Sequence, residues 1–143
     1  MKSPYIGLAA TLLAGCASTH AMPDRVPVDS AQLALYRQHA GAAVPRFRYA
    51  GHLVSWTPLG PHTLAVRTGR RQAYLLELSG PCPDLEFAPA VSVTDSLGSV
   101  STHFDRVIPL GTGANVPCPI AEIRPLDLAA IHAAERARTA GTP

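Results

Sequence analysis

Apolar residues recur at helical spacing near the start of the chain and at alternate positions in its middle. Leu33, Tyr36 and Ala40 fall on one face of a helix, which we expect to begin at residue 29 or 30. Gly41 is a typical residue to follow a helix end. The pattern therefore predicts an N-terminal helix with one weakly apolar face.

The central part of the chain has the alternating pattern of β-strands. Residues 62–68 and 72–78 alternate, and a loop with a glycine and two arginines joins them, which predicts an antiparallel hairpin. On the second strand Tyr74, Leu76 and Leu78 share one face, whereas Glu77 faces the other way. Residues 45–49 are interpreted as a connection and 95–99 as a turn. Further short strands are expected at residues 53–56, 91–94, 104–110 and 118–124.

A second helix is predicted at the C-terminal end. Pro125 opens it, Asp127 lies near its start, and Leu128 and Ile131 occupy one side. The predicted fold is α+β: a small antiparallel β-sheet flanked by an N-terminal and a C-terminal helix, with one disulfide. The 143 residues suit one such domain, assigned to residues 29–136, with a flexible tail at 137–143. No internal repeat is visible.

The first 16 residues have the features of an export signal. Lys2 is followed by an apolar run over residues 5–13, and small residues lead to Cys16. The run is much shorter than the roughly 20 apolar residues that span a bilayer. The stretch Leu13-Ala14-Gly15-Cys16 resembles a bacterial lipobox, in which the cysteine is lipidated and the signal is cut before it. Residues 1–15 are therefore predicted to be a lipoprotein signal peptide.

A lipid on Cys16 predicts where in the cell the protein is located. Several acyl chains on one residue anchor firmly, because each buried CH2 contributes about 0.8 kcal/mol. Ala17 follows the cysteine in place of aspartate, and by resemblance to enterobacterial sorting this favours the outer membrane, facing the periplasm. Residues 16–28 are small, polar or proline, and we interpret them as a tether between membrane and domain.

Two cysteines remain for the folded domain. Cys82 and Cys118 each lie between prolines, and a chain in an oxidising compartment most simply pairs them. The alternative is a redox-active or metal-binding pair. The chain has no Cys-x-x-Cys and no histidine close to either cysteine, which favours a structural disulfide.

Charge and motifs exclude several classes of function. The net charge is +2 with Lys2 included, and a value this small predicts no attraction to nucleic acid. No Gly-x-Ser-x-Gly elbow or paired zinc-ligand motif occurs. Gly111-x-Gly113 lacks the third glycine of a dinucleotide loop and leads into a proline-rich strand. We therefore expect no metal, no cofactor and no catalytic residue that a motif identifies.

Arg67, Arg70 and Arg71 form the densest basic cluster, at the tip of the predicted hairpin. Guanidinium groups bind phosphate and carboxylate in a planar, two-bond geometry, so this cluster is a candidate surface for head groups or an acidic partner. The simpler alternative is a solvated turn.

His103 and Asp105 are the second candidate pair. They have the same parity on a strand, so both side chains would point the same way and could join His52 or His62. Such a cluster would bind a small ligand or a metal ion. The alternative is that these are ordinary residues at strand ends.

Several of these segments together resemble a known family. They are Trp56, residues 73–78 running into Gly80-Pro81-Cys82, Phe104-Asp105-Arg106-Val107, and Cys118-x-Ile120 with Glu122-Ile123-Arg124-Pro125. The pattern is similar to a family of small proteobacterial lipoproteins that is a domain of unknown function. The resemblance covers about residues 53–128 and includes the lipobox-type start. It implies the lipoprotein address and the disulfide, and it implies no catalytic residue or ligand.

Three functions remain compatible with the sequence. The leading hypothesis is a non-enzymatic interaction or structural module, held to the membrane by its N-terminal lipid and contacting another envelope protein. The second is a periplasmic accessory protein that binds a small ligand or metal. The third is a hydrolase with an unrecognised site.

Overall fold

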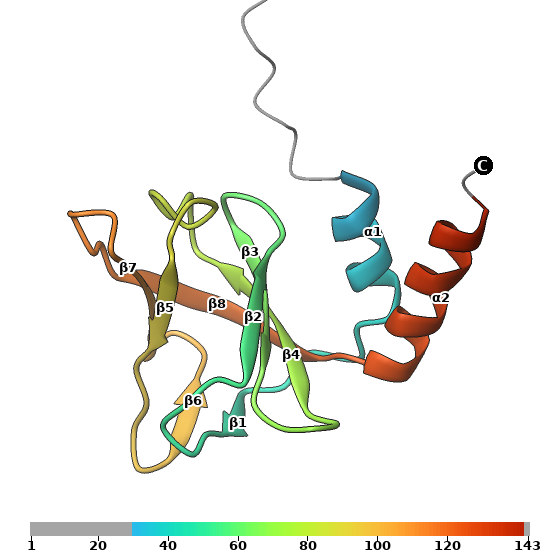
Figure 1. The fold of residues 1–143 in the computed structure, drawn as a ribbon. Coiled ribbons are helices and arrows are strands. Elements are labelled where there is room, and N and C mark those ends of the chain that lie inside the picture. Colours follow the sequence, from blue (N-terminus) through green and yellow to red (C-terminus); the bar gives the residue numbers. More distant parts are fainter. Residues whose placement is uncertain (1–29, 142–143) are drawn as a thin grey trace, which may run out of the picture.

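The computed structural model describes residues 30–141. The predicted signal peptide, the tether and Cys16 lie outside the described residues. The elements, shown in Figure 1, are α1 (Ser30–Gln38), β1 (Arg46–Arg48), β2 (Ser55–Pro58), β3 (Thr63–Arg67), β4 (Ala73–Leu78), β5 (Ala90–Val93), β6 (Ser99–Ser101), β7 (Arg106–Leu110), β8 (Cys118–Pro125) and α2 (Leu128–Ala140).

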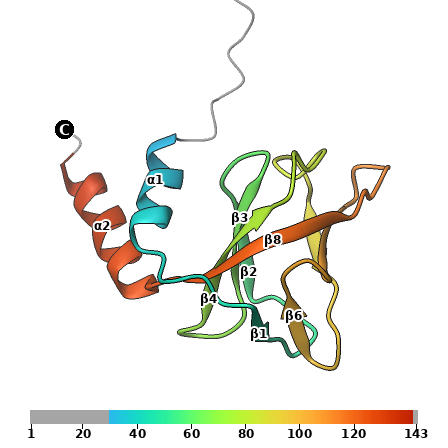
Figure 2. The same ribbon diagram turned by 180° about the vertical axis from the view of Figure 1, so that it is seen from behind.

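Six of the strands form one antiparallel sheet in the order β2-β3-β4-β8-β7-β5, and β1 pairs with β6 separately. The long strand β8 joins the two halves of the larger sheet, as Figure 2 shows from behind. Its first two residues pair with β7, and the part from Ile120 to Pro125 pairs with β4. Because β8 pairs with β7 along its start and with β4 along the rest, it joins the two halves of a sheet that curls toward a barrel (Figure 1).

The predicted α+β class is confirmed, but the β-structure is larger than the small sheet that we expected. Residues 45–49 were interpreted as a connection, yet they contain β1. The turn expected at residues 95–99 is present, and β6, which was not predicted, begins at its last residue. Each of these strands has three residues and a single inward apolar side chain, Phe47 or Val100, and these two residues pair directly. One apolar residue per strand shows no alternation, so the sequence pattern could not reveal them.

Two apolar layers fill the domain, one on each face of β3 and β4. Inside the curled sheet, Leu64, Val66 and Leu76 belong to the main core. Its other members come from β1, from β4 to β8, and from the segments that follow β1 and β4. On the outer face, Leu75 packs in a second cluster with Ile131 of α2. Because both faces are covered, β3 and β4 are the most extensively buried of the described strands.

The two helices lie on the same side of the sheet (Figures 1 and 2). Asp127 is the N-cap of α2 and accepts a hydrogen bond from Ala130 N at 3.0 Å. Pro125, expected to open this helix, is instead the last residue of β8. The helix continues to Ala140, past residue 136, where we expected the ordered domain to end. Among the described residues, no helix is long and apolar enough to cross a membrane.

An ion pair attaches α1 to β4. Arg37 donates to both carboxylate oxygens of Glu77, at 3.0 and 3.2 Å, and Thr63 Oγ1 donates to the same carboxylate at 2.7 Å. Glu77 therefore faces the helices, opposite to the core side chains of β4, as the alternation predicted.

The predicted disulfide is present. Cys82 and Cys118 are bonded, with their Cα atoms 5.6 Å apart, and both are buried. The bond connects the segment after β4 to the first residue of β8. That is also where β7 and β8 are held by only two paired positions, Arg106 with Pro119 and Val107 with Cys118. The disulfide thus reinforces the shortest ladder of the sheet.

Candidate ligand-binding surface at the β3–β4 hairpin

The hairpin predicted from the sequence is formed by β3 and β4. Residues 68–72 make its loop, which closes through hydrogen bonds from Thr68 N and Gly69 N to Gln72 O, at 2.9 and 3.3 Å. The loop places Arg67 at the end of β3, and Arg70 and Arg71 at its tip. The predicted basic cluster therefore lies on one short, hydrogen-bonded turn.

Arg67 borders a cavity of about 110 Å³ between the sheet and the helices. Its Nε donates to Gly69 O at 3.2 Å, which holds the half-buried side chain against its own loop. Tyr36 of α1, Trp56 of β2 and His132 of α2 also line this cavity. Residues that are distant in the sequence thus meet where the helices cover the hairpin.

Arg70 and Arg71 border a larger hollow of about 390 Å³ at the start of α2. Leu126, Leu128 and His132 line both this hollow and the smaller cavity, so the two adjoin. We call them together the hairpin groove. Both arginines are exposed, and neither makes a hydrogen bond or ion pair with any residue from 30 to 141. Their guanidinium donors are free to bind an anion.

Among the described residues that line the groove, Asp127 is the acidic one. Its carboxylate caps α2. At the cavity end, burial raises the pKa of the Tyr36 phenol. The nearby Glu135 carboxylate raises it further, while a hydrogen bond with Thr57 acts in the opposite direction. Tyr36 is therefore a neutral hydrogen-bonding group at neutral pH. The groove combines an apolar lining with a cationic rim, which suits a ligand that carries a carboxylate or phosphate next to an apolar part.

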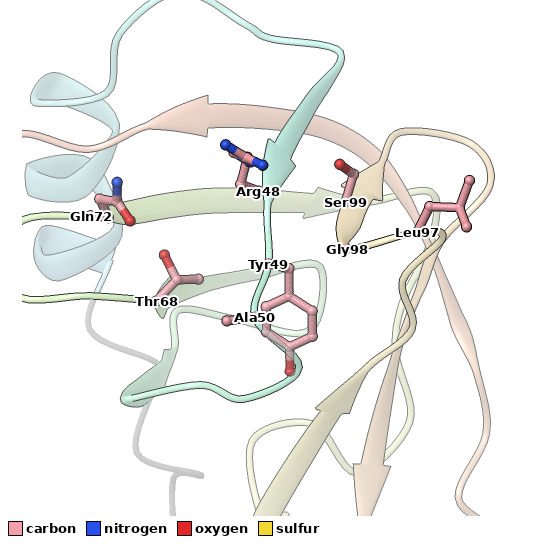
Figure 3. Close-up of a pocket in the computed structure, with 8 residues that line it drawn as sticks. All are labelled: Arg48, Tyr49, Ala50, Thr68, Gln72, Leu97, Gly98 and Ser99. Atoms are coloured by element: carbon pink, nitrogen blue, oxygen red, sulfur yellow. The ribbon is translucent and has the colours of Figure 1, made fainter.

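The same loop borders a second hollow of about 390 Å³, shown in Figure 3. Thr68 and Gln72 of the loop line it, together with Arg48, Tyr49 and the β5–β6 turn. In Figure 3 the Tyr49 ring, just after the end of β1, and the Arg48 side chain point in different directions. Tyr49 is buried in the core, and this burial, followed by the Asp95 carboxylate, raises the pKa of its phenol.

The second predicted pair, His103 and Asp105, does not form a site. Residues 102–104 are a turn, and β7 begins only at Arg106, so the parity argument does not apply. The His103 residue has a φ of 67° and is exposed, whereas Asp105 is buried. The carboxylate oxygens of Asp105 accept from Thr94 Oγ1 at 2.9 Å and Ser101 N at 2.7 Å. Asp105 is a structural residue that ties the segment after β5 to β6.

Histidine and acidic side chains do not gather elsewhere in the described part of the chain. His52 and His62, the expected neighbours of His103, are exposed in the loops before β2 and β3. Residues 30–141 contain no group of three or more His, Cys, Asp or Glu that could hold a metal ion.

Sequence reasoning missed several residues of these hollows. Trp56, Tyr36 and His132 were not expected to lie with the arginines. They meet only because both helices cover the hairpin, and no local pattern encodes that arrangement. Arg48 was missed because β1 was not recognised. Leu97 had one usable signal, a Leu-Gly pair in a short turn where Asn-Gly is usual.

The fold defines a disulfide-linked α+β domain with a groove that arginines border. The chain matches the family of unknown function DUF6491 over residues 1–142 and belongs to this family. The predicted membership in a domain of unknown function is thereby confirmed. No curated protein and no solved structure matches the chain.

Proposed function

We propose that the protein is a non-enzymatic binding module of the bacterial cell envelope. A lipid on Cys16 anchors it, most naturally in the outer membrane facing the periplasm, and the hairpin groove binds an anionic group of another envelope component. The observation that carries this proposal is the pair of exposed, unpaired arginines, Arg70 and Arg71, beside an apolar groove.

The lipid anchor is supported by the sequence. The run from Lys2 through the apolar segment to Leu13-Ala14-Gly15-Cys16 has the order of an export signal followed by a lipidated cysteine. The disulfide is consistent with an oxidising compartment outside the cytoplasm.

Binding at the groove is supported by its chemistry. The groove is preformed by packed elements, since Leu126 belongs to the outer apolar cluster and Leu128 packs against it. A preformed groove costs a ligand little ordering of the protein. The guanidinium groups of Arg70 and Arg71 make no hydrogen bond with residues 30–141, so they can donate charge-assisted hydrogen bonds to an anion without breaking existing ones.

Photo-cross-linking in living cells tests the proposal. A photo-reactive residue replaces Ala129, which is exposed and lines the groove, so that all three arginines stay intact. The matched control replaces Ala137, an exposed alanine two turns further along α2. We expect a defined cross-linked product at position 129 and none at 137.

The charge of the hairpin is then varied. Arg70→Gln together with Arg71→Gln should reduce the product at position 129 by roughly tenfold or more, since tenfold corresponds to about 1.4 kcal/mol and each charge-assisted contact contributes about 1.5–3 kcal/mol before screening. The captured component should carry carboxylate or phosphate groups. The same yield with and without the arginines, or equal capture at positions 129 and 137, contradicts the proposal.

A further inference from the structure

The β5–β6 turn contains a residue that does not suit its conformation. Ser96 and Ser99 exchange two hydrogen bonds, from Ser96 N to Ser99 O at 2.9 Å and from Ser99 N to Ser96 O at 3.1 Å. Leu97 and Gly98 between them have φ values of 53° and 74°. Positive φ at both central residues is the type I′ geometry, in which asparagine, aspartate or glycine is strongly preferred at the first position.

Leu97 also contributes nothing to the core. Its side chain is fully exposed, at 105% of the reference value. Both its backbone conformation and its exposed apolar surface are unfavourable, and no contact inside the domain offsets them. A residue that is poor for the turn and absent from the core indicates a role in contact with something outside the domain.

The hollow beside this turn supplies polar partners. Arg48 is exposed and makes no hydrogen bond or ion pair with any residue from 30 to 141. Thr68 Oγ1 is buried and has no hydrogen-bond partner within the same range. Gln72 and Ser99 stand on either side of Arg48 in the view of Figure 3. The hollow is thus lined by one cationic side chain, one unpaired hydroxyl and two neutral polar side chains. Leu97 adds an apolar side chain to this lining.

We propose that this hollow, bordered by Arg48, Thr68 and Leu97, is a binding site for a small molecule that joins an oxyanion to an apolar group. Arg48 pairs with the carboxylate or phosphate, and Leu97 covers the apolar part. The volume of about 390 Å³ is within the range of small-molecule sites. This site is separate from the hairpin groove and does not depend on the function proposed for it.

One acidic side chain lies near the site. Asp95 Oδ2 accepts a hydrogen bond from Gly98 N at 3.0 Å, so the carboxylate is engaged in the turn. It lies close enough to Tyr49 to act on that phenol. The Asp95 carboxylate is therefore held by the turn backbone and does not pair with Arg48. The N–H donors of the Arg48 guanidinium stay available to a ligand.

Photo-labelling with a defined probe tests the inference. The probe is a hexyl phosphate whose alkyl chain carries a diazirine, and the protein is the full lipid-anchored chain in phosphatidylcholine nanodiscs. Labelled positions are read by mass spectrometry. We expect labels at or beside Leu97, and competition by unlabelled hexyl phosphate. Competition by hexanoate at equal strength assigns the ligand to carboxylates and phosphates alike, and competition by hexyl phosphate alone assigns it to phosphates.

Variants separate binding from folding. Leu97→Asn should leave the melting temperature unchanged or higher, because asparagine suits the turn, and should lower labelling about tenfold. Leu97→Met should restore labelling, and Arg48→Gln should lower it about tenfold. Arg106→Gln, at an exposed arginine on β7, should leave labelling at Leu97 unchanged.

Three results overturn the inference. The first is full labelling of the Leu97→Asn protein. The second is competition by inorganic phosphate as strong as that by hexyl phosphate, which removes the role of the apolar group. The third is labelling that is spread over the surface and insensitive to Arg48→Gln. Because the groove arginines do not enter these outcomes, failure here is distinguishable from failure of the proposed function.

Discussion

Removing the disulfide tests how the sheet is held closed. The variant is Cys82→Ala with Cys118→Ala, which leaves no free thiol in the described domain. The bond closes a loop with a sequence separation of 36 residues, and the loss of this constraint on the unfolded chain costs about 4 kcal/mol. Both cysteines are buried in the main core, so the lost sulfur atoms add to the cost.

The assay is thermal unfolding followed by circular dichroism. For a domain of about 110 residues, each kcal/mol lowers the melting temperature by about 4 °C, so we expect a decrease of about 15 °C. Arg70→Ala is the control, because an exposed arginine without partners changes stability by at most about 0.5 kcal/mol. Its melting temperature should stay within about 2 °C of the parent.

The position of the bond predicts where the loss appears. The β7–β8 ladder has two paired positions, whereas β4 pairs with β8 from Tyr74 to Leu78. Amide hydrogen exchange should therefore accelerate at Val107 and Ile120 more than at Leu75. A decrease of less than about 3 °C, or equal decreases in the cysteine and Arg70 variants, would refute the reasoning.

Three further predictions concern the proposed lipid anchor, the buried carboxylate of Asp105 and two tyrosines with raised pKa values. Cys16→Ala should move the protein from the membrane to the soluble fraction; a mutant that stays in the membrane without incorporating lipid contradicts the anchor. Asp105→Ala should lower stability by about 2–4 kcal/mol in chemical unfolding, because it leaves Ser101 N and Thr94 Oγ1 without their acceptor. A loss below about 1 kcal/mol, as expected of a surface residue, would contradict the structural role. Tyr36 and Tyr49 have raised pKa values in the folded state, so their contribution to stability is complete below about pH 10 and lost as the pH rises through the folded values. Urea unfolding should show that alkaline loss, and it should be smaller in Tyr49→Phe.

Long alternating segments and chemical constraints were predictable from the sequence. The β3–β4 hairpin, the orientation of Glu77 and the disulfide all follow from local patterns or from the cysteine count. The C-terminal helix was also predicted, with Asp127 near its start, but Asp127 proves to be its N-cap, whereas Pro125 was expected to open the helix.

The rest depended on tertiary contacts. β1 and β6 exist because Phe47 and Val100 meet in the core, although neither strand has a pattern of its own. The proposed His103 and Asp105 site failed because a turn with positive φ at His103 interrupts the strand that the parity argument required. The cluster of three arginines could be found in the sequence, but the groove beside it could not. The groove forms only when α1 and α2, from opposite ends of the described chain, pack over the hairpin.

The most direct test of the central claim is the reactivity of individual arginines in intact envelopes. Phenylglyoxal modifies accessible guanidinium groups, and Lys2 is the single lysine of the sequence, so lysine side chains add little to the pattern. If the hairpin groove is occupied in the cell, Arg70 and Arg71 should react several-fold more slowly in envelopes than in the purified protein. Exposed Arg106 should react equally in both. Equal reactivity of Arg70 and Arg71 in the two preparations would contradict the proposed function.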